Sequence, residues 1–159
     1  MCDVWRQSKK DLPASIWITA LRQLESRLGY FYVGFTGGEI LLKDDVFEVF
    51  EFCHKAQLPY TITTNGKLLT PFNIERLLEL QPLNINISID SLDSEVYKEI
   101  RGVSYIEEVK SNIEYLMTYI KANSLDTKVF FKTVVNNLNL TELPSIAIYA
   151  KEMGVSGIT

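Results

Sequence analysis

Predicted strands and helices alternate along almost the whole chain, and this alternation limits the possible folds more than any other feature. Apolar or β-branched strand segments cover 31–36, 60–64, 85–89, 129–135 and 156–159, and helical periodicity covers 16–28, 46–53, 71–78, 94–101, 104–120 and 141–153. Strands separated by helices cannot form hairpins, so we expect parallel strands joined by right-handed crossovers. The result is an open doubly wound sheet or a barrel.

Several helix ends carry recognisable capping signals. Asp44-Asp45 and Thr70-Pro71 are expected to start helices, and Ser104 with Glu107 has the spacing of a capping box. Gly154 is expected to end the helix that contains Pro144 near its start. These signals agree with helices in the segments that connect the predicted strands.

The predicted strands have one polar face, which favours a barrel over a doubly wound sheet. In the segment 84–90, three isoleucines alternate with Asn84, Asn86, Ser88 and Asp90. Strands covered by helices on both faces normally read as continuous Val, Ile and Leu. The same polar alternation recurs at Thr61, Thr63 and Asn65, at Tyr32, Gly34, Thr36 and Gly38, and at Lys132 and Asn136. We therefore expect a partial barrel with a polar lumen.

Composition excludes several classes of function. The 159 residues are 47% hydrophobic and 23% charged, which is ordinary for one globular domain. A net charge of -4 without a block of Lys or Arg argues against a nucleic-acid-binding protein. No run of about 18 apolar residues is present and the first residues do not resemble a secretion signal, so we expect a cytoplasmic protein without a membrane partner.

The two cysteines and the single histidine lie in different contexts. Cys53 shares an apolar helical stripe with Val49 and Phe50, so we expect it in the core, and His54 beside it is expected to be structural. Cys2 has no packing pattern around it and no His or Asp at the spacing of a nucleophile pair. Two cysteines are too few for a disulfide framework.

Polar and glycine residues follow each predicted strand. These are Gly37-Gly38-Glu39, Thr64-Asn65-Gly66, Ser88-Ile89-Asp90 and Asn136. Parallel α/β folds bind ligands at the carboxyl ends of their strands, so these residues form the expected ligand site. The glycines allow a ligand close to the backbone, and Glu39 could pair with a ligand ammonium group.

Two cations near this edge remain open to two interpretations. Lys132 lies in an otherwise apolar strand, either as a solvated side chain at a strand end or in contact with cofactor or substrate. Arg101 before Gly102 either interacts with a helix C-terminus or belongs to the site.

The combination of these segments resembles the radical S-adenosylmethionine (radical SAM) superfamily. The resemblance is carried, in order and spacing, by Cys2-Asp3-Val4-Trp5, Gly37-Gly38-Glu39-Ile40-Leu41-Leu42, Thr63-Thr64-Asn65-Gly66, Ser88-Ile89-Asp90-Ser91 and Ile100-Arg101-Gly102. It is strongest to the branch containing the molybdenum-cofactor cyclase and the SPASM-type peptide maturases. The resemblance implies a partial (β/α)6 TIM-like barrel in which the first strand is missing and the sixth is incomplete. Residues 1–159 are then a single core-domain fragment, truncated at both ends.

The resemblance also implies a cofactor set and a role for individual residues. The cofactors would be a 4Fe-4S cluster, with Cys2 as its metal ligand and catalytic residue, and SAM. The implied SAM-binding residues are Met1, Gly37, Gly38, Glu39, Asn65, Ser88, Asp90, Arg101 and Asn136. The family's reaction is reduction of SAM to a 5'-deoxyadenosyl radical that abstracts hydrogen from a substrate.

The implied function is that of a radical SAM enzyme, with this fragment inactive alone because a cluster needs more thiolates than Cys2 supplies. Expected partners are a small-molecule or peptide substrate and an electron donor such as flavodoxin or ferredoxin. A non-catalytic cofactor-binding or scaffold relative is the alternative. An unrelated barrel hydrolase or aldolase that uses Lys132 or Asp90 is a third possibility.

Overall fold

The computed structural model describes residues 11–159, and its elements alternate as the sequence predicts. The strands are β1 (Val33–Phe35), β2 (Tyr60–Thr64), β3 (Asn84–Ser88), β4 (Lys128–Lys132) and β5 (Gly157–Ile158). The α-helices are α1 (Ala14–Leu28), α2 (Val46–Lys55), α3 (Pro71–Glu79), α4 (Ser94–Arg101), α5 (Ile106–Ala122) and α6 (Leu143–Met153). Two short 3-10 helices, η2 (Ile40–Leu42) and η3 (Leu140–Glu142), follow β1 and β4.

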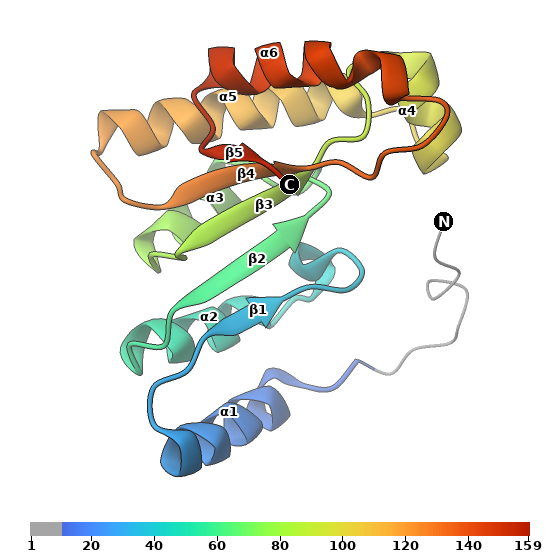
Figure 1. Ribbon diagram of the computed structural model, residues 1–159. Coiled ribbons are helices and arrows are strands. Elements are labelled where there is room, and N and C mark those ends of the chain that lie inside the picture. The colour runs from blue at the N-terminus through green and yellow to red at the C-terminus, as the bar shows by residue number, and fades with distance from the viewer. Residues whose placement is uncertain (1–10) are drawn as a thin grey trace.

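The five strands form one parallel sheet in the order β1-β2-β3-β4-β5. Right-handed crossovers between neighbouring strands place every connecting helix on the same side. Figure 1 accordingly shows α2, α3, α5 and α6 along one side of a curved sheet that does not close. The prediction of a parallel, partial α/β barrel is confirmed.

The two faces of the sheet differ as the sequence pattern predicts. Ile85, Ile87 and Ile89 are fully buried beneath the helices, whereas Asn84, Asn86 and Ser88 are half-buried on the opposite face. We call this opposite face the concave face; its strand residues are Gly34, Thr61, Thr63, Asn84, Asn86, Ser88, Lys128, Phe130, Lys132 and Gly157.

Strand register arranges the concave face in layers. Thr61, Asn84 and Lys128 are register partners near the amino ends of β2, β3 and β4. Thr63, Asn86, Phe130 and Gly157 form the next layer, and Ser88 pairs with Lys132 in the layer closest to the carboxyl ends.

Three strands, β1, β4 and β5, are shorter than predicted. β4 ends at Lys132 instead of Val135, since the Val134 N–H donates to the Asp90 carboxylate at 2.8 Å. β1 covers only Val33–Phe35, and the backbone beyond it reaches a φ of 139° at Gly37.

Two capping predictions were wrong in detail. Asp45 is the N-cap residue of α2 but makes no capping bond, because its carboxylate accepts the Ala14 N–H at 2.7 Å and pairs with Lys43. Helix α5 begins at Ile106 after Tyr105, so Ser104 and Glu107 form no capping box. By contrast, Thr70 caps α3 as predicted, accepting the Asn73 N–H at 3.4 Å.

The core lies between the helices and the sheet. An aromatic group joins the β1–β2 edge to α2: the rings of Phe35 and Phe50 lie 5.2 Å apart, and those of Phe50 and Tyr60 lie 5.4 Å apart. Cys53 on the same helix is completely buried in this core, which confirms its expected packing role.

Burial should make Cys53 unreactive in the folded protein. Desolvation raises the pKa of its thiol to about 11. We therefore expect a Cys2→Ser variant to react with iodoacetamide at pH 8 at least about a hundred times more slowly when folded than in urea. Mass spectrometry of timed samples would measure both rates, and comparable rates would contradict the buried position.

No helix within residues 11–159 is long and apolar enough to cross a lipid bilayer.

Candidate functional site

The segments that follow β1, β2, β3 and β4 meet at one edge of the sheet. Because the strands are parallel, their carboxyl ends all point to this edge. Glu39, Asn65, Asp90 and Asn136 follow these four strands in turn. The topology thus gathers the strand-end residues predicted from the sequence at the same end of the sheet.

Glu39 ties the first two of these segments together. Its Oε1 accepts hydrogen bonds from the Thr64 hydroxyl at 2.8 Å and from the Leu41 N–H at 3.2 Å. Its Oε2 accepts the Asn65 N–H at 2.7 Å. A carboxylate oxygen can accept two bonds, so Oε2 retains acceptor capacity. Glu39 is therefore held in place by neutral donors, with its negative charge available to a cation.

The two glycines before Glu39 leave open space around the backbone. Gly37 has a φ of 139°, which L side chains rarely adopt. A Cβ added at Gly37 or Gly38 would meet no heavy atom within 4 Å outside the adjacent residues. Gly38 and Glu39 also line a hollow of about 520 Å³ together with Trp17, Phe35 and Lys43. A ligand can approach the backbone at this point.

The turn after β2 is tightly packed. Gly66 has a φ of 82°, and a Cβ there would lie 2.8 Å from the Val109 side chain on α5. The Asn65 side chain accepts the Lys67 N–H at 2.9 Å, which closes an Asx turn. Asn112 of α5 donates to the Gly66 carbonyl at 3.0 Å. Position 66 must be glycine for both conformation and space.

Asp90 and Arg101 form a buried ion pair between β3 and α4. The Arg101 Nη2 lies 2.6 Å from the Asp90 Oδ2, and Asp90 is only 4% exposed. The other Asp90 oxygen accepts the Val134 N–H at 2.8 Å. The Arg101 Nε is buried and has no partner among the described residues. Arg101 therefore both neutralises Asp90 and keeps one unused charged donor.

Tyr97 lies near this pair and is completely buried. Its hydroxyl also has no hydrogen-bond partner among residues 11–159. Burial raises the pKa of this hydroxyl well above its usual range. The Tyr97 ring packs edge-on against that of Tyr105, with ring centroids 5.8 Å apart. Of the two buried groups, the Arg101 Nε is therefore the charged donor without a partner among the described residues, which is uncommon in folded proteins.

Ser88 and Asn136 occupy different environments. Ser88 is half-buried on the concave face, opposite Lys132 on β4. The Asn136 side chain accepts the Leu138 N–H at 2.8 Å, so its carbonyl oxygen serves the local loop. Its amide lies 3.4 Å from the Val134 carbonyl, a long contact that leaves the amide able to donate elsewhere.

One of two buried polar residues at this edge, Asn139, was missed by sequence reasoning. Asn139 is completely buried and donates to the carbonyls of Asp90 at 2.8 Å and Val134 at 3.0 Å. Thr64 is buried and holds Glu39. Thr64 belongs to the strand-end set expected from the sequence, whereas nothing in the local sequence distinguishes Asn139 from Asn136 or Asn137.

Met1 and Cys2 lie outside the described residues. Within residues 11–159 no group of three or more His, Cys, Asp or Glu side chains is arranged to hold a metal ion. The described part of the chain does fit the polar end of an amino-acid cofactor: a charged carboxylate at Glu39, open backbone at Gly37 and Gly38, and an unused donor on Arg101.

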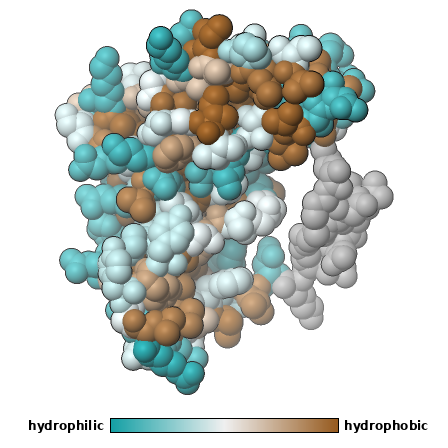
Figure 2. Space-filling view, in the orientation of Figure 1, coloured by the Kyte–Doolittle hydropathy of each residue, from teal (hydrophilic) through white to brown (hydrophobic). Residues whose placement is uncertain are grey.

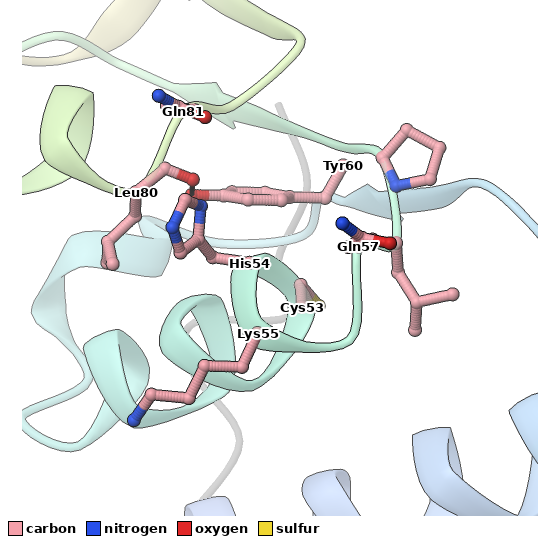
Figure 3. A pocket seen from close by; sticks show the side chains of 9 residues that line it. Cys53, His54, Lys55, Gln57, Tyr60, Leu80 and Gln81 are labelled. Carbon is pink, nitrogen blue, oxygen red and sulfur yellow. Dashed lines mark hydrogen bonds between the residues drawn. The ribbon is translucent and has the colours of Figure 1, made fainter.

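A second hollow lies at the opposite, amino-terminal end of β2, away from these residues. It measures about 510 Å³ and is lined by His54, Tyr60, Leu80 and neighbouring side chains. Figure 3 shows His54 beside the hydroxyl end of Tyr60, with Lys55 pointing away. The Tyr60 hydroxyl donates to the Leu80 carbonyl at 3.2 Å, which ties β2 to the C-terminal end of α3. The His54 side chain is exposed, and its structural role stays a prediction.

Comparisons with known proteins give a consistent result. A model of the Radical SAM superfamily matches residues 1–147. A probable GTP 3',8-cyclase of Thermococcus kodakarensis is 33% identical over 144 residues, which cover 86% of this chain and 43% of that protein. An AdoMet-dependent heme synthase of Methanosarcina barkeri is 32% identical over 120 residues, covering 75% of this chain and 33% of that protein.

Solved structures show the same fold. The crystal structure of Streptococcus suis SuiB bound to S-adenosylmethionine superposes with a TM-score of 0.81 at 22% identity, covering 96% of this chain and 34% of SuiB. The chain spans less than half the length of each of these three proteins.

Proposed function

The chain belongs to the radical SAM superfamily, and from this we propose that it forms the SAM-binding core of an enzyme that makes a 5'-deoxyadenosyl radical. Enzymes of this family use a 4Fe-4S cluster and SAM for hydrogen abstraction. The observation that carries the proposal is the Glu39 carboxylate, fixed by three neutral donors beside two glycines with open space around them.

Glu39 is the proposed ligand of the methionyl ammonium group. Its three hydrogen bonds fix the carboxylate before any ligand arrives, so little conformational freedom is lost on binding. The ammonium group can reach Oε2 because Gly37 and Gly38 leave the approach open. A charge-assisted hydrogen bond at this point would fix one end of SAM.

Arg101 is the proposed donor to the methionyl carboxylate. Asp90 is engaged by Arg101 and by the Val134 N–H, so we assign Asp90 to positioning Arg101 and the segment after β4 rather than to direct contact with SAM. The unpaired Arg101 Nε supports this assignment. Ser88, Asn65 and Asn136 are proposed to lie along the ribose and adenine.

Cys2 is the proposed cluster ligand of this chain, and the backbone at Met1 is proposed to face the adenine. A cluster of this type needs further thiolates. Cys53 cannot serve, because it is completely buried in the core. We propose that the other cysteine ligands belong to a longer parent protein, of which residues 1–159 are a single core domain, and that this chain alone is inactive.

The substrate and the electron donor are also proposals. The relatives named GTP 3',8-cyclase and AdoMet-dependent heme synthase favour a small-molecule substrate. A solved SuiB complex with the precursor peptide SuiA favours a peptide. Flavodoxin or ferredoxin is the proposed donor of the electron, and the cytoplasm the proposed location.

Substitution of Glu39 tests the proposal. In the full-length parent, reconstituted without oxygen, Glu39→Gln is expected to weaken SAM binding by about 10-fold to 100-fold, because it removes a charge-assisted contact. Equilibrium dialysis would measure affinity, and chromatography would measure 5'-deoxyadenosine. Glu79→Gln, an exposed site at the end of α3, is the matched control and should change neither.

The result distinguishes the alternatives. Unchanged SAM affinity in the Glu39→Gln protein, with an unchanged melting temperature, would contradict the proposed role of Glu39. Tight SAM binding without 5'-deoxyadenosine formation, in a parent that carries a complete cluster, would instead favour a non-catalytic cofactor-binding relative.

A further inference from the structure

The concave face offers hydrogen-bonding groups but very little charge. The five strands contribute no Asp or Glu to it, and its only charged strand residues are Lys128 and Lys132, both on β4. This is unexpected in a protein whose formal net charge is -4. The two lysines therefore give this face a local positive charge, which favours an anionic ligand.

Lys132 lies at the end of the concave face where the candidate site is. It is exposed, and it occupies the layer nearest the carboxyl ends of the strands. No carboxylate of residues 11–159 forms an ion pair with it, whereas Asp90 at the same edge is paired with Arg101. The Glu39 carboxylate is held by Thr64 and Asn65 at the end of β2, two strands away. The Lys132 ammonium group therefore remains available for an external anion.

The residues around Lys132 offer a ligand a hydroxyl donor and an aromatic ring. Ser88 faces it across the β3–β4 pair and can add a hydroxyl donor. Phe130, two residues earlier, lies on the same face, and its ring comes within 3.4 Å of where a Cβ at Gly157 would stand. Glycine at that position leaves one side of the aromatic ring uncovered by a side chain.

We propose that Lys132, with Ser88, binds an anionic group of the substrate, a phosphate or a carboxylate, while the body of the substrate lies against Phe130. This inference rests on the proposed function, since it assigns the concave face to the substrate of that reaction. The cofactor carboxylate is not the intended partner. The Glu39 carboxylate is bonded to Thr64 and Asn65 at the end of β2, and strands are spaced about 4.8 Å apart, so β4 lies roughly 10 Å along the sheet from it. The methionyl carboxylate is already assigned to Arg101, whose Nε has no partner among the described residues.

Anion titrations of the full-length, SAM-saturated parent test the inference. Sodium pyrophosphate and sodium succinate serve as phosphate and carboxylate probes, with heat of binding as the readout. We expect saturable binding of at least one probe with a Kd on the order of 1 mM. Lys132→Met should weaken that binding about 10-fold or more, whereas Lys132→Arg should retain it within about threefold.

Lys128→Met is the matched control, because Lys128 lies on the same strand face but two layers closer to the amino end. It should change probe affinity less than about threefold. A preference for pyrophosphate indicates a phosphate-bearing substrate, and a preference for succinate indicates a carboxylate.

Three results would overturn the inference: no saturable binding of either probe, equal effects at positions 128 and 132, or a Lys132→Met protein that loses SAM affinity instead of probe affinity. Each leaves the proposed function intact if 5'-deoxyadenosine still forms in the wild-type protein. Loss of the proposed function would appear separately, as absent SAM cleavage in every variant.

Discussion

Replacement of Gly66 by alanine is expected to lower the free energy of unfolding by about 3 kcal/mol, combining left-handed strain with overpacking. The φ of 82° disfavours any L side chain, and the new methyl group would lie 2.8 Å from Val109 and 3.1 Å from Ile87. Both neighbours are completely buried, so neither can move aside freely. Urea denaturation of the purified chain followed by circular dichroism would measure the loss.

Gly102→Ala separates the two contributions. Gly102 has a similar φ of 73°, but a Cβ there would meet no heavy atom within 4 Å. It should therefore cost only about 1 kcal/mol, the conformational part alone. Equal losses at the two positions would show that the turn after β2 is not closely packed against α5.

Replacement of Arg101 by methionine is expected to cost about 2–3 kcal/mol, somewhat less than the roughly 3–5 kcal/mol for breaking a fully buried ion pair. The Asp90 carboxyl group, only 4% exposed, would lose its ion-pair partner and keep the Val134 N–H as its remaining contact. The expected cost is smaller than for a fully buried pair because the Arg101 side chain is 21% exposed. Denaturation at pH 7 would measure the change.

A double-mutant cycle attributes this cost to the pair. Asp90→Asn keeps an oxygen that can accept the Val134 N–H but removes the charge. The double variant, Asp90→Asn with Arg101→Met, should therefore be more stable than Arg101→Met alone. Additive losses would mean that the two side chains do not interact energetically. The same Arg101→Met change in the full-length parent should also weaken SAM binding if Arg101 holds the methionyl carboxylate.

The faces of the strands followed directly from the sequence. Alternation of Asn84, Asn86 and Ser88 with three isoleucines required one buried and one more polar face, because successive strand side chains point to opposite sides. The helices between the strands required parallel pairing. These two local rules were enough to predict a partial barrel and the edge at which its strand-end residues meet.

The partners of the site residues could not be predicted in the same way. Asp90 was expected near the cofactor, and its carboxylate is engaged by Arg101 and by the Val134 N–H. Asn139, which no sequence pattern singles out, donates to the carbonyls of Asp90 and Val134 and so joins the segments after β3 and β4. Asp45 was expected to cap α2 but binds the start of α1, which is 31 residues away in the chain. Figure 2 shows hydrophobic side chains exposed at opposite ends of the view, a distribution that strand periodicity does not reveal.

The sequence by itself determined the order of elements, their parallel arrangement, the polar face and the family, because each depends on local periodicity or on short spacings. Only the tertiary structure decided which polar groups are satisfied within the chain and which remain available to a ligand. Hydrogen bonds and ion pairs depend on distances of a few ångströms between segments far apart in sequence, and the packing of helices on the curved sheet sets those distances.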